Sequence, residues 1–313
     1  MTTLEISELR LMQGLAQQVT ASRPELLNGD ATVGELAWVW AKDYDAFHPF
    51  WRHRLWFADG ALAGWGWACL PYRILRGDGT FRESDRANLT WQAHPERPEL
   101  LNEILDWYDE TAPGIDRVLT VQSADTAAQA IVALHGYAFD AEAGADDGSW
   151  VQFNARELTD VPDPPLPKGF RFRTAEDVSA AQAVWAHRDA WPTSAFTETA
   201  FERVQHTWPY RADLHVLVEA VDGTLAASAI IWLDEVTRTA EFEPVGTHRA
   251  FRRQGLGNAL QLHGMQRAKA AGATRMLVAC LGAPAHPVAR NLYLGVGFRK
   301  ISHDLPQIKV GRR

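Results

Sequence analysis

The sequence predicts an α+β (mixed α/β) fold in two tandem domains, each a mixed central β-sheet flanked by helices. Three observations predict it. A proline-rich segment lies near the middle of the 313 residues, strand and helix patterns alternate after it, and the part before it repeats that order faintly. A chain of this length with 46% hydrophobic residues can bury two cores of ordinary size.

The proline-rich segment marks the expected domain boundary. Residues 161–169 contain four prolines and favour an extended, semi-rigid spacer. We therefore expect a first domain at residues 1–155, a linker at residues 156–168 and a second domain at residues 169–313.

The second domain is expected to begin with a helix and to continue with strands. Thr174 followed by Asp177 has the pattern of a helix N-cap, which predicts a helix over residues 175–186. Strand patterns then follow at residues 214–221, 225–233 and 239–247. The last expected elements are a helix over residues 255–271, a strand over residues 275–281 and a proline-bounded loop.

A glycine turn lies between the last of the three strand patterns and the long helix. It reads Arg252-Arg253-Gln254-Gly255-Leu256-Gly257-Asn258. A helix N-terminus has unpaired N–H groups and a positive dipole end, both of which attract anions. Glycines let a phosphate reach those amides, and arginines add cationic donors. The turn therefore predicts a pyrophosphate site.

Other nucleotide sites fit this turn poorly. A P-loop requires Gly-Lys-Ser/Thr, whereas the turn continues Gly257-Asn258-Ala259. A dinucleotide fingerprint requires a third glycine where this chain has Leu260. When the turn is considered alone, a second interpretation stays possible. It could be an ordinary strand-to-helix turn that carries glycine and arginine without binding an anion.

A second motif follows the turn. It reads Ala289-Arg290-Asn291-Leu292-Tyr293 and precedes Gly297-Phe298. Together with Arg252-x-x-Gly255-x-Gly257, it makes residues 241–299 resemble the GNAT superfamily of N-acetyltransferases. One departure is His286, where the family often has asparagine. The resemblance implies two tandem GNAT-like domains, the second of which binds acetyl-CoA as co-substrate, uses no metal, and acetylates a primary amine by direct attack in a ternary complex.

The resemblance also implies roles for individual residues. Glu241 and Glu243 are candidates for the general base, which takes a proton from an ammonium group with an unperturbed pKa near ~10.4. They are two residues apart on one expected strand and therefore point to the same face. Tyr293 is the candidate acid for the departing thiolate. The alternatives are a structural pair of strand carboxylates and a tyrosine that only fills the core.

The same resemblance implies which residues contact acetyl-CoA. A backbone N–H near Val245 is expected to stabilise the thioester oxygen during attack. The expected cofactor-binding set is Val245, Gly246, Thr247, Arg252, Arg253, Gln254, Gly255, Leu256, Gly257, Asn258, His286, Ala289 and Asn291.

The first half carries a faint repeat of the second. The matching strand, helix and strand lie at residues 89–94, 100–111 and 118–122. The residues expected to bind the pyrophosphate are missing from this repeat. Residues 94–101 contain two carboxylates and no glycine, and Val132 stands where the second half has Tyr293. We therefore expect residues 1–155 to be a degenerate GNAT-like domain, with an unrelated α+β module as the alternative.

Two features bear on the acceptor. The tryptophans of the first half either line an aromatic acceptor pocket or pack a core or the domain interface, as large aromatics commonly do. Six of them fall early in this half and are Trp38, Trp40, Trp51, Trp56, Trp65 and Trp67. Residues 194–208 are expected to form a helical wall of the acceptor site.

Composition excludes several classes of protein. The two cysteines, Cys69 and Cys280, are too few for a disulfide scaffold, and the histidines lack metal-ligand spacing. A net charge of −8 argues against a nucleic-acid surface and mildly favours cationic acceptors. No apolar run approaches the ~20 residues of a membrane span, and the N-terminus lacks the order of a signal peptide.

We therefore expect a cytoplasmic monomer or homodimer that acts on a small-molecule or peptide amine. Two other functions remain open. One is a non-catalytic acyl-CoA sensor, and the other is acyl transfer with another donor or acceptor, as in small-thiol biosynthesis.

Overall fold

The computed structural model describes residues 3–311 and confirms the mixed α/β class. The strands of its first half are β1 (Trp51–Ala58), β2 (Ala61–Cys69), β3 (Tyr72–Leu75), β4 (Phe81–Ser84), β5 (Ala87–Ala93), β6 (Arg117–Gln122), β7 (Ala138–Phe139) and β8 (Val151–Glu157). Those of the second half are β9 (Phe170–Thr174), β10 (His215–Ala220), β11 (Leu225–Asp234), β12 (Thr239–Thr247), β13 (Arg275–Leu281) and β14 (Arg299–Lys309).

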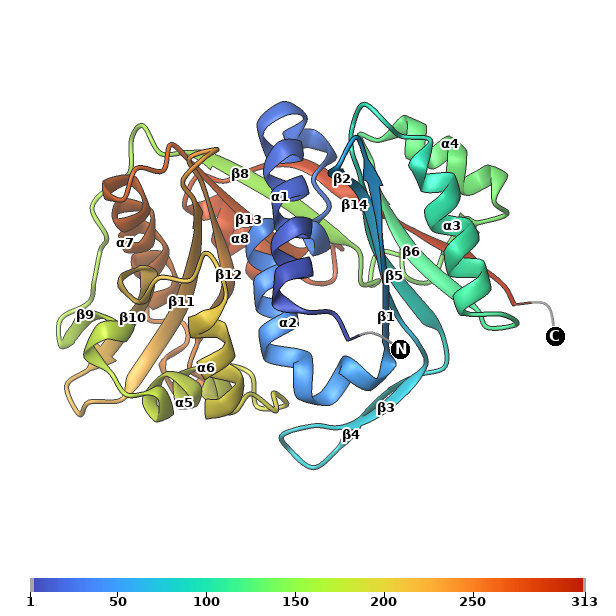
Figure 1. Cartoon of the computed structure of the whole chain (residues 1–313). Coiled ribbons are helices and arrows are strands. Elements are labelled where there is room, and N and C mark those ends of the chain that lie inside the picture. Colours follow the sequence, from blue (N-terminus) through green and yellow to red (C-terminus); the bar gives the residue numbers. More distant parts are fainter. Residues whose placement is uncertain (1–2, 312–313) are drawn as a thin grey trace.

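One mixed sheet of 12 strands runs through this part of the chain (Figure 1). Its order is β1-β2-β5-β6-β14-β8-β13-β12-β11-β10-β9, with β7 beside β14, while β3 and β4 form a separate hairpin. The helices are α1 (Ile6–Ser22), α2 (Val33–Phe47), α3 (Leu100–Thr111), α4 (Thr126–Leu134), α5 (Ala180–Ala190), α6 (Glu198–His206), α7 (Leu256–Ala270) and α8 (Pro287–Gly295). Within the described residues, none of these helices combines the length and apolar content needed to cross a membrane.

The last strands of the two halves are exchanged. Strand β8 of the first half pairs antiparallel with β13 of the second, and β14 of the second half pairs antiparallel with β6 of the first. The two exchanged strands also pair with each other. Each half of the sheet is therefore completed by a strand of the other half. The expected boundaries at residues 155 and 169 stay a prediction.

Helices of the first half lie against strands of the second. In Figure 1, α1 and α2 stand between the two ends of the sheet, whereas α3 and α7 lie outside them. Helix α2 contacts α6, β11 and β12 as well as β3. Its N-terminus is capped by Thr32, whose hydroxyl accepts a hydrogen bond from the N–H of Glu35. This packing brings α2 next to the strand that carries Glu241 and Glu243.

Most of the tryptophans of the first half pack the core between these layers. Trp38, Trp40, Trp51, Trp65 and Trp67 belong to one buried cluster, which also includes Trp232 of β11. Trp56 belongs to the separate cluster beneath α3. Three of them, Trp38, Trp51 and Trp67, also line cavities that the next section describes. The packing interpretation therefore holds for most of these side chains, and a role in an acceptor pocket stays a prediction for Trp38, Trp51 and Trp67.

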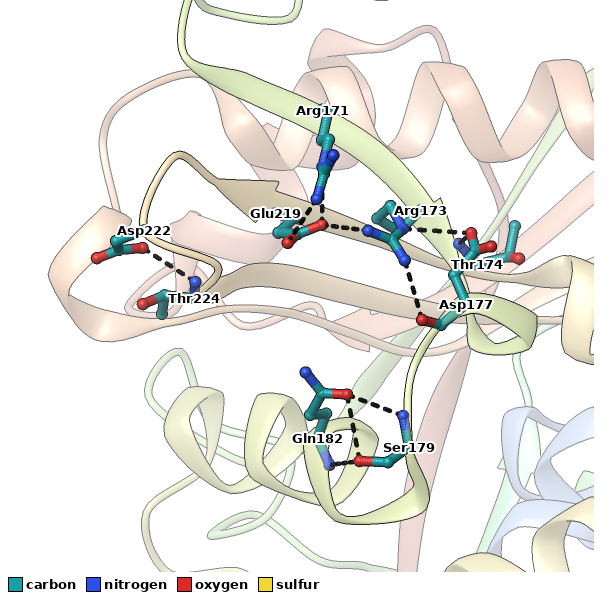
Figure 2. Close-up of polar contacts among 9 residues, drawn as sticks. All are labelled: Arg171, Arg173, Thr174, Asp177, Ser179, Gln182, Glu219, Asp222 and Thr224. Atoms are coloured by element: carbon teal, nitrogen blue, oxygen red, sulfur yellow. Dashed lines mark hydrogen bonds and ion pairs between the residues drawn. The ribbon is translucent and has the colours of Figure 1, made fainter.

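The expected helix over residues 175–186 is wrong in its start and in its end. A short 3-10 turn, Ala175–Asp177, comes first, and α5 begins only at Ala180. Figure 2 shows the reason, since Thr174 with Asp177 and Ser179 with Gln182 form two successive capping boxes. The second box starts a new helix after the extended residue Val178.

The outer edge of the second half is held by charged side chains. Arg171 and Arg173 of β9 both donate to the carboxylate of Glu219 on β10 (Figure 2). The turn that follows β10 is closed by Asp222, whose carboxylate accepts from the N–H of Thr224. These contacts fix the edge farthest from the first half.

Candidate active site

Strands β12 and β13 begin as a parallel pair and then diverge. Their pairing runs from Thr239 opposite Arg275 to Phe242 opposite Val278, and no later pair joins them within the described chain. Strand β12 continues to Thr247 and stays paired with β11 on its other edge. The inner edge of residues 243–247 therefore faces an opening between two parallel strands. An extended chain could add to this edge through backbone hydrogen bonds.

An irregularity in β12 falls at the start of this opening. The register with β11 shifts between Ala229 and Ile231, opposite Glu243 and the residue after it. Such bulges bend a strand and redirect side chains, often beside active sites. The indole N–H of Trp232 donates to the Glu243 carbonyl oxygen at 2.6 Å, which holds the backbone at this point.

The glycine turn leads into α7 as expected. The helix begins at Leu256 after Gly255, whose φ of 80° lies in the left-handed region that glycine tolerates. No side chain caps this end, so the first-turn N–H groups are available to an anion. A Cβ on Gly257 would lie 3.3 Å from both δ-methyls of Leu292, which places α8 directly beside the turn.

Arg252, which the sequence predicts to bind the pyrophosphate, also makes structural hydrogen bonds within the protein. Its guanidinium donates to the carbonyl oxygens of Thr247 at 3.2 Å and Ala190 at 3.1 Å. These bonds tie the turn to the end of β12 and to the end of α5. Arg253 and Gln254 are exposed. Contact of any of these side chains with a pyrophosphate stays a prediction.

Residues of the later motif differ in exposure. Asn291 and His286 are exposed, and the His286 Nε2 lies 3.2 Å from the carbonyl oxygen of Asp147. Ala289 is half-buried against the core of the second half. Their expected contacts with acetyl-CoA also stay predictions.

Glu241 is held by the N-terminus of α2. Its carboxylate accepts from the Thr32 hydroxyl at 2.7 Å and from the Gly34 N–H at 3.0 Å. Burial raises its pKa to about 7, while these two hydrogen bonds act in the opposite direction. A carboxylate engaged in this way stabilises a helix end.

Glu243 is free to act on a ligand. Within residues 3–311, no group donates a hydrogen bond to its carboxylate. Burial, together with the charge of Glu241, raises its pKa to about 8, while Lys42 opposes the shift. The two candidate bases therefore have different environments, and Glu243 is the one with a free carboxylate.

Tyr293 lies on α8 and is 7% exposed. Burial raises its pKa above the ordinary value, and the charge of Glu243 adds to the shift. The phenol therefore keeps its proton through the neutral range and can donate it. Its ring packs edge-on against Phe298, with the ring centroids 5.8 Å apart.

Two cavities meet at Glu243. The first, here called the helix lobe, has a volume of about 770 Å³ and lies between α2, the β3–β4 hairpin and the segment around α5 and α6. The second, here called the carboxylate lobe, has a volume of about 430 Å³ and lies between α2, β2, β5 and the same hairpin. Glu243, Trp38 and Lys42 line both lobes.

The acceptor wall expected at residues 194–208 stays a prediction, and only part of this segment lines a cavity. Residues 194–197 and Ala200 line the helix lobe, whereas Trp208 stacks under the guanidinium of Arg10 at 3.7 Å, away from it. Sequence reasoning missed the contribution of α2 and of the hairpin. No local pattern marks it, because these elements meet Glu243 only through the packing of one half on the other.

The first half also contains a pair of parallel strands that diverge, but it lacks the glycine turn of the second half. Strands β5 and β6 are parallel at residues 87–89 and 117–119 and then diverge. The indole N–H of Trp91 donates to the Thr120 carbonyl oxygen at 3.1 Å and bridges the opening. Helix α3 follows Glu99, a carboxylate, where α7 follows a glycine. Anion binding is disfavoured at this end.

Among residues 3–311, no group of three or more His, Cys, Asp or Glu side chains is placed to hold a metal ion.

Comparison with known proteins shows what this chain is similar to. Residues 181–298 match the model of the acetyltransferase (GNAT) family. A GCN5-related N-acetyltransferase from Sphaerobacter thermophilus is 16% identical with a TM-score of 0.59, covering 98% of this chain and 94% of that one. A tandem GNAT protein from the clavulanic acid biosynthesis pathway is 14% identical with a TM-score of 0.61, covering 100% and 98%. A search of curated protein sequences found no match.

Proposed function

We propose that this chain, whose residues 181–298 form a domain of the GNAT acetyltransferase family, is an acetyl-CoA-dependent N-acetyltransferase that acts on a primary amine. The observation that carries the proposal is the position of Glu243. Its free carboxylate lies where the opening between β12 and β13 meets two cavities large enough for an acceptor. Both substrates of a direct transfer could therefore meet at one carboxylate.

Different segments of the chain are suited to bind different parts of acetyl-CoA. The inner edge of residues 245–247 is suited to pair with the amides of a pantetheine arm. The uncapped start of α7 and the adjacent arginines are suited to its pyrophosphate. When bound, acetyl-CoA supplies the thioester carbonyl that the amine attacks.

The chemistry then needs two proton movements. The Glu243 carboxylate takes a proton from the attacking amine, directly or through water, as the new C–N bond forms. A backbone N–H near Val245 stabilises the negative charge on the carbonyl oxygen. The C–S bond breaks, and the Tyr293 phenol donates a proton to the leaving thiolate. Solvent returns a proton to Tyr293 and removes one from Glu243.

A combined binding and turnover experiment tests this function. Calorimetric titration with acetyl-CoA is expected to give one site per chain, because α3 of the first half follows the carboxylate Glu99 where α7 follows a glycine. Release of free CoA thiol is then measured with a panel of primary amines. One site together with amine-dependent thiol release supports the proposal. Binding without thiol release from any amine supports the acyl-CoA sensor instead.

Tyr293→Phe is expected to lower kcat by roughly ten- to a hundredfold while leaving the affinity for acetyl-CoA unchanged. The reason is that the phenol acts only on the leaving group, so its loss affects the transition state rather than the ground state. Steady-state kinetics and calorimetry measure the two quantities. Tyr137→Phe is the matched control, since it removes another buried phenol, which lies in the first half and has no hydrogen-bond partner among residues 3–311. An equal loss in both variants would contradict the role of Tyr293.

A further inference from the structure

Trp232 holds the backbone of Glu243 through its side chain. It lies on β11 opposite Glu241, yet its indole N–H donates to the carbonyl oxygen of Glu243, two residues farther along β12, at 2.6 Å. Its side chain is 1% exposed, so the surrounding core fixes where the N–H points. The indole therefore binds the backbone of the residue that carries the proposed base.

This hydrogen bond falls at the bulge of β12. One residue of β11 lies there opposite Glu243 and Pro244 together. Proline has no backbone N–H, and the extra residue of a bulge is left out of the ladder. The regular ladder is therefore interrupted at Glu243, and the indole of Trp232 supplies a bond at this point.

The bulge contains two groups that the proposed transfer uses. The carbonyl that Trp232 binds belongs to the same residue as the Glu243 carboxylate, and the N–H expected to stabilise the thioester oxygen lies near Val245, two residues on. Such groups accelerate a reaction only when their positions are fixed beforehand. A displacement of about 1 Å can lower a rate on the order of a hundredfold.

The first half contacts Trp232 through Gly34. Helix α2 lies beside β11 and β12 (Figure 1), and Gly34 is in its first turn. A Cβ on Gly34 would lie 2.6 Å from Cδ1 of Trp232 and 2.5 Å from a carboxylate oxygen of Glu241. Cδ1 is bonded to the indole nitrogen, so α2 rests against the edge of the ring that carries the N–H. Only glycine lets the helix backbone come this close.

The start of α2 is fixed by residues of other elements. The side-chain amide of Gln13, on α1, donates to the carbonyl oxygen of Val33 at 3.0 Å and to that of Trp208 at 2.7 Å. The Thr32 hydroxyl donates to the Glu241 carboxylate on β12. The turn of α2 that contacts Trp232 is therefore tied to both halves of the chain.

We propose that Trp232 is a positioning residue for the transfer, which fixes the bulge of β12 through its indole N–H, and that Gly34 of the first half keeps Trp232 in this position. The first half, which lacks the glycine turn, then contributes to the rate of the reaction in the second half. This inference rests on the proposed function, because it takes the reaction to occur at Glu243.

Trp232→Phe removes the N–H and keeps an aromatic ring. It is expected to lower kcat roughly tenfold or more, while the affinity for acetyl-CoA changes by less than about threefold because the glycine turn is unaltered. The rise of kcat/KM with pH should persist, since Glu243 is still present. Trp65→Phe is the matched control, because this side chain is 0% exposed, belongs to the same buried cluster and has no partner for its N–H among residues 3–311.

Amide hydrogen exchange gives a readout that does not depend on turnover. Exchange at residues 245–247 is expected to be about tenfold or more faster in Trp232→Phe than in Trp65→Phe, because the bulge has lost its anchor. If Trp232→Phe does not fold, Trp232 is replaced by benzothienylalanine, which keeps the shape of the ring and has sulfur in place of the N–H. The same loss of kcat and the same faster exchange are expected.

Gly34→Ala tests the contribution of the first half. Its Cβ should displace Trp232 and lower kcat roughly fivefold or more, whereas Gly14→Ala, whose Cβ meets open space in α1, should leave kcat unchanged. Because Gly34 acts through Trp232, the double variant Gly34→Ala/Trp232→Phe should lose little more than Trp232→Phe alone. Fully additive losses would overturn the role of Gly34.

The outcomes separate this inference from the proposed function. Equal kcat and equal exchange in Trp232→Phe and Trp65→Phe would overturn the inference and leave the proposed function intact. Faster exchange in Trp232→Phe with an unchanged kcat would also overturn it, since the bond would then be structural only. A wild type that releases no thiol from any amine would overturn both, which the amine panel shows before any variant is made.

Discussion

Gly257→Glu is expected to abolish acetyl-CoA binding while the chain stays folded. The substituted side chain would start 3.3 Å from Leu292 and 3.7 Å from the Thr247 hydroxyl, in the first turn of α7. Its carboxylate would enter the region proposed for the pyrophosphate. Two like charges about 4 Å apart repel by roughly 4 kcal/mol near a protein surface. Since each 1.4 kcal/mol is tenfold in affinity, a loss on the order of a hundredfold or more follows.

Two control variants separate charge from shape and from general damage. Gly257→Ala adds only the Cβ, which meets the flexible ends of Leu292, so it should retain measurable binding. Gly14→Glu makes the same substitution in α1, where the new Cβ has open space, and should bind acetyl-CoA normally. Calorimetry gives the affinities, and thermal unfolding shows that each variant is folded. Normal binding by Gly257→Glu would disprove the assignment of this turn.

Glu243→Gln is expected to lower kcat by about a hundredfold or more, the usual contribution of a positioned general base. Glutamine keeps the shape of the side chain but cannot take the proton of the amine. In the wild type, kcat/KM should rise with pH through about 8, the raised pKa of Glu243. The variant should lose this rising limb. A limb that persists unchanged would show that another group is the base.

Glu241→Gln should behave differently from Glu243→Gln. Its amide can still accept a hydrogen bond from Thr32 or Gly34, so the variant is expected to lose stability but to keep the rising limb of the rate profile. Loss of the limb in this variant alone would reverse the assignment of the two carboxylates.

Stability gives a readout of Glu243 that is independent of catalysis. A carboxyl whose pKa is raised from 4.5 to about 8 on folding holds its proton more tightly in the native state. Its contribution to the free energy of unfolding is complete below pH 4.5 and is lost as the pH rises through about 8. Glu243→Gln should therefore flatten the fall in stability between these pH values, as measured by urea unfolding.

The elements that the sequence predicted well are those with local signals. The strands at residues 239–247 and 275–281 and the helix at residues 100–111 have the predicted bounds. In each, hydrophobic period and bounding residues act within a short stretch of chain. The helix predicted at residues 175–186 failed because two capping boxes, at residues 174–177 and 179–182, follow one another, and a pattern of single caps does not decide between them.

The sequence also predicted the residues of the transfer site, but not their division of labour. Glu241 and Glu243 are equivalent in sequence, because both lie on one face of one strand. Their difference depends on Thr32 and Gly34, which are 209 and 207 residues away from Glu241 along the chain. Only the packing of α2 on β12 brings the helix end to one carboxylate and leaves the other facing the cavities.

By itself, the sequence determined the α+β class, the resemblance to the GNAT family and the glycine turn, since each depends on residues close together in the chain. The tertiary structure decided the exchange of β8 and β14, the two lobes at Glu243 and the packing of Gly34 on Trp232. These depend on contacts between the two halves, whose geometry no local pattern encodes. The first half, which lacks the chemistry of the second, supplies much of the wall of the proposed acceptor site.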